Sequence, residues 1–121
     1  MFKKLECVCL HTVDIESSLS FYRLMGLTER WRIKRELDGG TAWNLIGLMF
    51  PEQDSSELVL SDHPEFNFTE IEISVDDVRQ TYAVLSRHPE IQWIRTPFAT
   101  ESGHVAVMEA PDGNAFVLVG K

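Results

Sequence analysis

Apolar and polar positions along the chain follow a pattern that occurs twice, 63 residues apart. In each copy, alternating apolar residues lead to an aspartate, and apolar residues at helical spacing follow it. The matching apolar positions are Val8 and Ile71, Leu10 and Ile73, Ile15 and Val78, Leu19 and Tyr82, and Tyr22 and Leu85. Period-two alternation is typical of a strand, and i, i+4, i+7 spacing is typical of an amphipathic helix. The pattern therefore predicts two similar halves, each with a strand followed by a helix.

The aspartates of the two copies are Asp14 and Asp77, and each precedes a predicted helix. Aspartate is favoured at the N-cap because its side chain accepts a hydrogen bond from a free backbone N–H of the first turn. We expect the first helix to end at Gly26, which suits the left-handed C-cap conformation. The second helix should end before Pro89, because the residue preceding a proline avoids the α region.

The other periodic stretches predict the strands. Eight are expected, at about 4–12, 28–36, 41–48, 57–60, 68–75, 91–96, 104–109 and 115–119. Asp38-Gly39-Gly40 and the segment 110–114 carry strong turn signals. The order is βαβββ, twice. This predicts an α+β fold in one domain over residues 1–121, with module one at about 1–62 and module two at about 63–121.

Composition narrows the class of protein. The chain has 121 residues and 44% hydrophobic residues, which suits one globular domain. A formal net charge of −8 argues against nucleic acid as a partner, because such binding depends on cations placed at phosphates. No stretch approaches the ~20 apolar residues of a membrane span. The beginning of the chain lacks a secretory pattern, so a cytoplasmic location is expected, with Cys7 and Cys9 reduced.

Two further motifs add to the repeat. Phe21-Tyr22 is followed by Gly26-Leu27, and a Pro-Asp-Gly-Asn turn at 111–114 precedes the last strand. With the paired βαβββ halves, these motifs resemble the glyoxalase/bleomycin-resistance/extradiol-dioxygenase family, or vicinal oxygen chelate superfamily. The resemblance covers essentially the whole chain. It implies two βαβββ modules that form a curved eight-stranded mixed sheet around a cavity, with the helices outside, and it implies a homodimer.

Metal-dependent members of this family carry histidines seven residues before each helix-capping aspartate, and glutamates on the fourth and eighth strands. Here the histidine positions hold Cys7 and Glu70, the fourth-strand position matches Glu57, and the eighth-strand position holds Val117. The repeat predicts that these four residues line one cavity, with Cys7 opposite Glu70 and Glu57 opposite Val117. A thiolate beside two carboxylates is an unusual donor set for this family, so no metal or other cofactor is expected. A divalent metal held by Cys7, Glu57 and Glu70 is the alternative.

Other residues join the predicted cavity. Glu70 and Glu72 alternate with apolar residues and so share one face of a strand. His11 lies ~13 Å from Cys7 along the same strand, too far to share a metal with it. Trp43 is the tryptophan with the best prospect of facing the cavity. The predicted ligand-binding residues are Cys7, Cys9, His11, Trp43, Glu57, Glu70, Glu72 and Val117.

Three functions are compatible with these residues. The first is a metal-free binding protein that sequesters a small molecule in an acidic, aromatic cavity, as bleomycin-resistance members do. The second is a metal-dependent lyase or dioxygenase with an atypical Cys/Glu ligand set. The third is a metal-independent enzyme in which Glu70 or Glu57 acts as a general base, after burial has raised its pKa. We favour the first.

Overall fold

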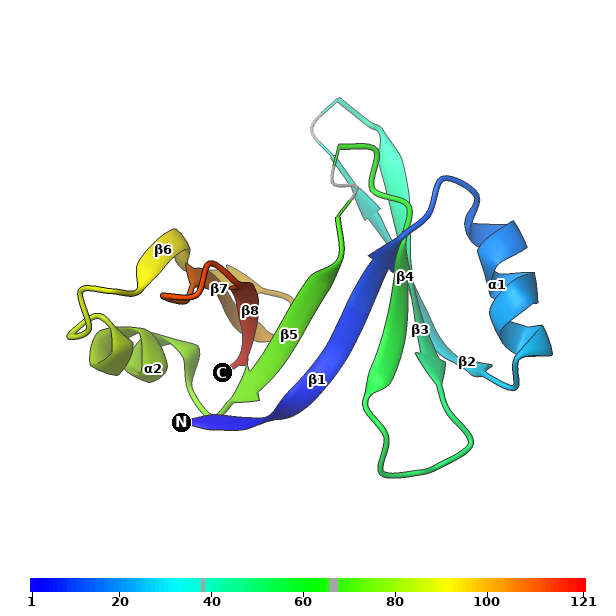
Figure 1. Cartoon of the computed structure of the whole chain (residues 1–121). Coiled ribbons are helices and arrows are strands. Elements are labelled where there is room, and N and C mark those ends of the chain that lie inside the picture. Colours follow the sequence, from blue (N-terminus) through cyan, green and yellow to red (C-terminus); the bar gives the residue numbers. More distant parts are fainter. Residues whose placement is uncertain (38, 66–67) are drawn as a thin grey trace. The chain divides into compact units, whose positions relative to one another are not determined.

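The computed structural model of the chain describes residues 1–37, 39–65 and 68–121 (Figure 1). Its elements, in chain order, are β1 (Phe2–His11), α1 (Ile15–Leu24), β2 (Thr28–Glu36), β3 (Ala42–Met49), β4 (Glu57–Ser61), β5 (Glu70–Val75), α2 (Val78–Leu85), β6 (Gln92–Thr100), β7 (Gly103–Glu109) and β8 (Ala115–Gly120). The helices begin 63 residues apart, as the sequence pattern predicts.

The chain divides into two compact units. The first-repeat unit comprises residues 7–69 and orders its strands β2-β3-β4-β1. The second-repeat unit comprises residues 1–6 and 70–121, and here the start of β1 is followed by β5-β8-β7-β6. Because β1 supplies residues to both units, all eight strands belong to one mixed sheet. The prediction of an α+β fold with two βαβββ repeats is confirmed.

Each repeat has the same strand pairing. β1 runs parallel to β4, and β5 runs parallel to β8. The remaining pairs, β2 with β3, β3 with β4, β6 with β7 and β7 with β8, are antiparallel. A helix connects the first two strands of each repeat, which lie at opposite edges of its four strands.

The core of the first-repeat unit lies between α1 and one face of its strands. The Asp14 side chain accepts a hydrogen bond from the Ser17 backbone N–H at 3.1 Å and so caps the helix, as predicted. The buried side chains of this core are Ile15, Leu19, Leu27, Ile46, Leu48 and Leu60. Leu10 and Tyr22 pack against them. The apolar stripe of α1 therefore covers the sheet face on which Leu10 lies.

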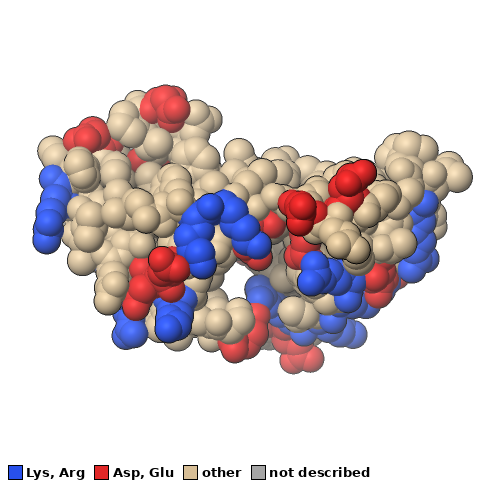
Figure 2. Space-filling view, turned by 90° about the horizontal axis from the view of Figure 1, so that it is seen from below, with Lys and Arg blue, Asp and Glu red and all other residues tan. Residues whose placement is uncertain are grey.

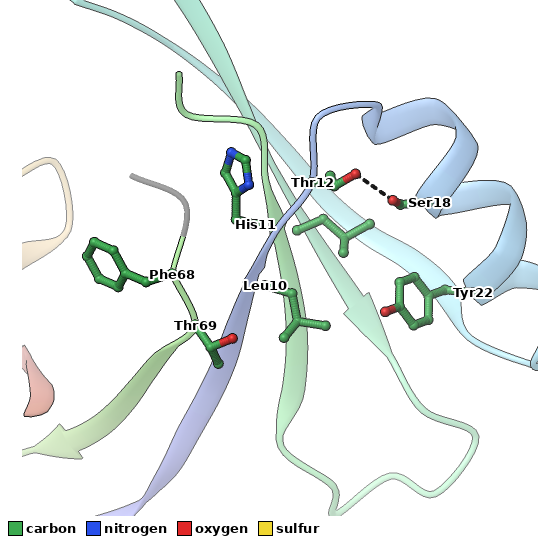
Figure 3. Close-up of a pocket in the computed structure, with 8 residues that line it drawn as sticks. Leu10, His11, Thr12, Ser18, Tyr22, Phe68 and Thr69 are labelled. Carbon is green, nitrogen blue, oxygen red and sulfur yellow. Dashed lines mark hydrogen bonds between the residues drawn. The ribbon is translucent and has the colours of Figure 1, made fainter. Parts of the chain in front are cut away.

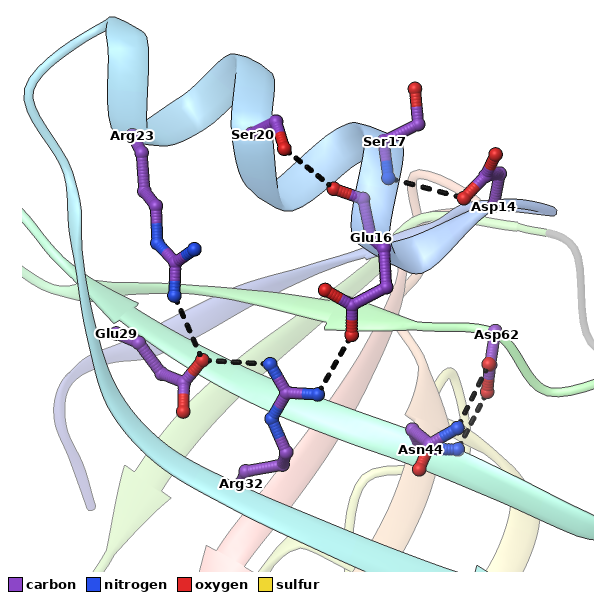
Figure 4. A network of polar contacts seen from close by, with 9 residues as sticks. All are labelled: Asp14, Glu16, Ser17, Ser20, Arg23, Glu29, Arg32, Asn44 and Asp62. Carbon is purple, nitrogen blue, oxygen red and sulfur yellow. Dashed lines mark hydrogen bonds and ion pairs between the residues drawn. The ribbon is translucent and has the colours of Figure 1, made fainter.

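Ion pairs fasten α1 to β2 on the same side (Figure 4). Arg32 of β2 contacts Glu16 of α1 at 2.9 Å and Glu29 at 2.8 Å, and Arg23 lies 3.6 Å from Glu29. The hydrogen bond from Arg32 lowers the pKa of the Glu29 carboxyl. The hydrogen bonds to Glu29 and then Glu16 raise the pKa of Arg32. This exposed network fixes the face of β2 on which Arg32 lies.

The second-repeat unit has the same arrangement, a capped helix over its strands, but different core side chains. Asp77 caps α2 by accepting from the Gln80 backbone N–H at 3.0 Å, again as predicted. Its core consists of Val75, Val78, Ala106, Met108 and Leu118. Tyr82 of α2 packs edge-on against Trp93 of β6, with ring centroids 4.7 Å apart. In this unit an aromatic pair joins the helix to the outer strand, whereas in the first-repeat unit ion pairs join α1 to β2.

Some boundaries differ from the predicted ones. β6 continues from the expected end at 96 to Thr100. Its pairing with β7 is irregular between Arg95 and Phe98, which lets the strand pass Pro97 although proline cannot donate a ladder hydrogen bond. In the expected turn at 38–40, Asp38 lies outside the described residues. Gly39 and Gly40 have φ values of 94° and 87°, which glycine adopts without strain.

The surface mixes charges of both signs. On the face in Figure 2, basic side chains lie beside acidic ones rather than in one continuous basic patch. Within the described ranges, neither helix has the length and apolar character needed to cross a membrane.

Candidate functional site

The face of the first-repeat strands that points away from α1 carries most of the predicted site residues of this unit. Strand register aligns Trp31, Gly47, Val59 and Cys9 in one row across β2, β3, β4 and β1. The Trp31 face, as we name this surface, consists of Cys7, Cys9, Trp31, Leu45, Gly47, Glu57 and Val59.

A β-bulge brings two neighbouring residues of β2 to one carboxylate. Between Glu29 and Trp31, β2 has one residue more than β3, and Arg30 is that extra residue. The Trp31 indole Nε1–H donates to the Glu57 carboxylate oxygens at 3.1 and 3.2 Å. Arg30 Nη1 lies 3.7 Å from Glu57 Oε2. In a regular strand adjacent side chains point to opposite faces, so the bulge is what lets Arg30 and Trp31 share Glu57.

Gly47 provides the space in which the Trp31 indole lies. A Cβ placed on Gly47 would overlap Trp31 Cε2 and Nε1. Because a Cβ projects from the sheet, the indole must lie across the sheet surface directly over Gly47. The ring is half-buried, and its N–H edge is held by Glu57. Glycine here is a requirement of close packing, since its φ is not positive.

The two cysteines are packing residues of the Trp31 face. Cys7 and Cys9 are 4% and 6% exposed, and no disulfide joins them. They cluster with buried Val59, and Trp31 and Leu45 pack against that cluster. A thiol behaves as a small apolar group in such surroundings.

An aromatic cluster lies beyond this row, at the ends of β1, β3 and β4. The Trp43 and His63 rings meet edge-on with centroids 4.6 Å apart, and the Arg35 guanidinium lies 5.6 Å from the Trp43 centroid. His11 Nε2 lies 3.0 Å from the His63 carbonyl oxygen. His63 is only 4% exposed, and the sequence analysis gave it no role. Its place two residues after the end of β4 is the signal that could have found it.

In the second-repeat unit, Glu72 is the register partner of Val117, and Glu70 lies two residues earlier on β5. All three are half-buried. The 63-residue repeat makes Glu72 equivalent to Cys9, whose partner on β4 is Val59. Val117 therefore corresponds to Val59, and the sequence-based match of Glu57 with Val117 is wrong. A two-residue offset between β4 and β8 cannot be seen in the sequence, because their connections differ in length.

Comparisons with known proteins complete this description. No protein-family model and no curated protein sequence matches the chain. Among solved structures, a hypothetical protein from Bacillus halodurans C-125 has a TM-score of 0.73 at 18% identity, over 98% of this chain and 94% of that one. A glyoxalase/bleomycin resistance protein/dioxygenase superfamily member from Vibrio splendidus 12B01 has a TM-score of 0.62 at 18% identity, over 95% and 97%. The chain has the glyoxalase fold.

Another similar structure is a methylmalonyl-CoA epimerase, with a TM-score of 0.71 and 15% identity over 97% of this chain and 94% of that one. Identities at this level establish the glyoxalase fold alone. They transfer no ligand, metal or reaction to this chain.

The residues of this glyoxalase-fold chain do not fit the metal that the fold family implies. The family positions matched from the sequence hold Cys7, Glu57, Glu70 and Val117, and Val117 offers no donor atom. The Glu57 carboxylate is engaged by Trp31 and Arg30. Among residues 1–37, 39–65 and 68–121, no three His, Cys, Asp or Glu side chains form a group suited to a metal ion. The convergence of Cys7 and Glu57 with Glu70 and Val117 on one cavity stays a prediction.

A pocket of about 210 Å³ lies on the α1 side of the first-repeat unit, where Ser18 and Tyr22 of α1 line it (Figure 3). Its lining residues are Leu10, His11, Thr12, Ser18, Tyr22, Leu60, Phe68 and Thr69. Of the predicted ligand-binding residues, it includes only His11. The Thr12 and Ser18 hydroxyls lie 2.7 Å apart and satisfy each other. We give more weight to the Trp31 face, because the pocket combines no charged group with its hydroxyls.

Proposed function

We propose that this glyoxalase-fold protein binds a small organic molecule on the Trp31 face and needs no metal to do so. The observation that carries the proposal is the engagement of Glu57 by the Trp31 indole and by Arg30. A carboxylate whose oxygens already accept from these donors supports an aromatic side chain rather than a metal ion or a proton transfer. The bleomycin-resistance branch of the fold superfamily supplies the analogy for such binding.

The composition of the Trp31 face also supports ligand binding. Binding sites for small molecules combine apolar and aromatic walls with a few placed polar groups. Here Cys7, Cys9 and Val59 supply the apolar wall, Trp31 the aromatic group and Glu57 the polar group.

The test is a fragment screen by ¹H–¹⁵N correlation NMR on ¹⁵N-labelled protein, purified with EDTA and checked by elemental analysis. We expect fragments to bind the EDTA-treated protein and to shift the backbone amide signals of Cys9, Gly47 and Val59. Addition of Zn²⁺ or Mn²⁺ should leave their affinities unchanged. Amide signals of the α1-side pocket, such as that of Ser18, serve as the internal control.

Two outcomes would contradict this function. The first is purified protein that retains close to one equivalent of metal, with binding that EDTA abolishes. The second is a set of fragments that shifts the amides around Ser18 and Tyr22 while those of Cys9 and Val59 stay still. The first would support a metal-dependent enzyme, and the second would move the site to the α1-side pocket.

A further inference from the structure

The geometry points to Trp31 as the stacking surface of the Trp31 face and to an uncharged, planar aromatic molecule as its ligand. This inference rests on the proposed function and adds the chemical class of the ligand. It depends on three observations: the orientation of the indole, its attachment to Glu57, and the balance of charge around it.

The indole is oriented for stacking. One ring face lies over Gly47, as the overlap with a Cβ at that position shows. The opposite ring face therefore points away from the sheet. Aromatic rings pair favourably in offset-stacked or edge-to-face arrangements, at about 0.5–1.5 kcal/mol beyond the burial of their area. A planar ligand placed on that outer face would extend the layer that Trp31 forms over β3.

The indole is also held in place before any ligand arrives. Its Nε1–H donates to Glu57 from a strand that the ion pairs of Arg32 fasten on the other side. A side chain fixed in this way loses little rotamer freedom on binding, so less of the interaction free energy is spent on ordering. Glu57 is thus a positioning residue that acts through Trp31.

The charge around Trp31 is balanced. The Glu57 carboxylate has Arg30 Nη1 at 3.7 Å, and the neighbours of Trp31 in its row are Gly47, Val59 and Cys9. A charged ligand would lose hydration at this place without gaining an uncommitted counter-ion from the pair. An uncharged ring has no such cost. Arg30 thus offsets the charge of Glu57, the residue for which the sequence suggests an acidic cavity.

Trp43 is less suited to this role. Its ring already contacts His63 edge-on and has the Arg35 guanidinium 5.6 Å from its centroid. It therefore provides a comparison within the same unit: an aromatic residue of the same type whose ring is already engaged.

The experiment compares three naphthalenes that differ in charge: 2-naphthalenemethanol, 2-naphthylmethylammonium and 2-naphthoate. Binding is measured by calorimetry, and the indole N–H signals of the three tryptophans are followed in ¹H–¹⁵N spectra. Trp31→Phe, Trp43→Phe and Trp93→Phe assign these signals. We expect the alcohol to bind at least about tenfold more tightly than either ion, a difference of ~1.4 kcal/mol. The Trp31 indole signal should move most.

Variants complete the test. Trp31→Phe, which keeps a ring, should bind the alcohol within a few-fold of the wild type, whereas Trp31→Leu should lose at least about tenfold. Trp93→Phe should leave binding unchanged. Tighter binding of either ion, or an indole shift at Trp43 or Trp93 in place of Trp31, would overturn the ligand class or the residue while leaving metal-free binding intact. If none of the naphthalenes binds while other fragments shift Cys9 and Val59, only this inference fails.

Discussion

The two repeats place the same row of four residues across their strands and fill it with different chemistry. In the first repeat the row reads Trp31, Gly47, Val59, Cys9, and in the second it reads Arg95, Val107, Val117, Glu72. In both, the pairing of the outer strand with its neighbour shifts by one residue just before the first member of the row. Backbone geometry is therefore shared down to the bulge, and the difference lies in the side chains.

The second member of the row explains the difference. Gly47 leaves room for an indole to lie across the sheet, whereas Val107 at the equivalent position fills that space with its own side chain. Arg95 instead lies over the Phe98 ring, with its guanidinium 3.9 Å from the centroid. The repeated scaffold thus carries an aromatic side chain at the first position of the row in one half and a cationic one in the other, and three of the four row positions differ.

The largest expected effect concerns the buried core leucines that both repeats have at equivalent positions. Leu60 and Leu118 occupy equivalent core positions and are 1% and 0% exposed. We expect Leu60→Ala and Leu118→Ala each to lower the free energy of unfolding by about 2–5 kcal/mol, since each leaves a cavity. Urea unfolding followed by circular dichroism measures both. A loss well below this range in only one variant would show that the two cores are not equivalent.

The next largest effect tests whether the Trp31 indole lies over Gly47, the row position at which the second repeat has Val107. Gly47→Ala should lower the free energy of unfolding by about 1–3 kcal/mol, because the new Cβ overlaps the Trp31 indole. In a Trp31→Ala background the same change should be neutral or stabilising, since alanine is favoured over glycine in a strand by ~0.5–1 kcal/mol. The double-mutant cycle measures this coupling. Equal costs in both backgrounds would place the indole elsewhere.

A smaller effect is expected at Glu57. Glu57→Leu removes the acceptor of the Trp31 N–H and should lower the free energy of unfolding by about 1–2 kcal/mol. Glu57→Gln retains a side-chain oxygen as acceptor, so its cost should be smaller. Trp93 differs from Trp31 in this respect, because its buried Nε1 has no hydrogen-bond partner among the described residues. If Glu57→Gln and Glu57→Leu cost the same, the carboxylate does not hold the indole.

The smallest expected effect concerns the exposed ion pair between Arg32 and Glu29 in the first repeat. Because Arg32 lowers the pKa of Glu29 in the folded protein, Glu29 contributes stability above its unfolded pKa and loses it as the pH falls through the folded pKa. The stability difference between wild type and Glu29→Gln should therefore be greater at pH 7 than at pH 3. It should also shrink at 1 M salt, because the pair is exposed. A difference that grows on acidification would contradict this assignment.

Most of the fold follows from local patterns in the sequence. The apolar periodicity and the capping aspartates Asp14 and Asp77 predict both helices, and β2 has the predicted bounds of 28–36. These features depend on residues close together in the chain. Local patterns do not predict that β6 continues past Pro97, because this depends on an irregularity in its pairing with β7.

The candidate site is predictable only in part. Alternation along β1 puts Cys7 and Cys9 on one face, and the two side chains lie in one buried cluster. The bulge at Arg30, the match of Val117 with Val59, and the burial of His63 depend on register between strands. Register is set by turns and packing across the sheet, which one sequence does not display. The tryptophan of greatest interest is consequently Trp31 rather than Trp43.

The Trp31 indole N–H signal, followed while Zn²⁺ is titrated into ¹⁵N-labelled protein, tests most directly whether Glu57 supports an aromatic surface or a metal. The account predicts a signal that moves in Glu57→Gln, where the charge of the acceptor is lost, and stays in place as Zn²⁺ is added to the wild type. A saturable shift with one equivalent of Zn²⁺, abolished by Cys7→Ala, would show that Glu57 leaves the indole for a metal ion, and would contradict the account.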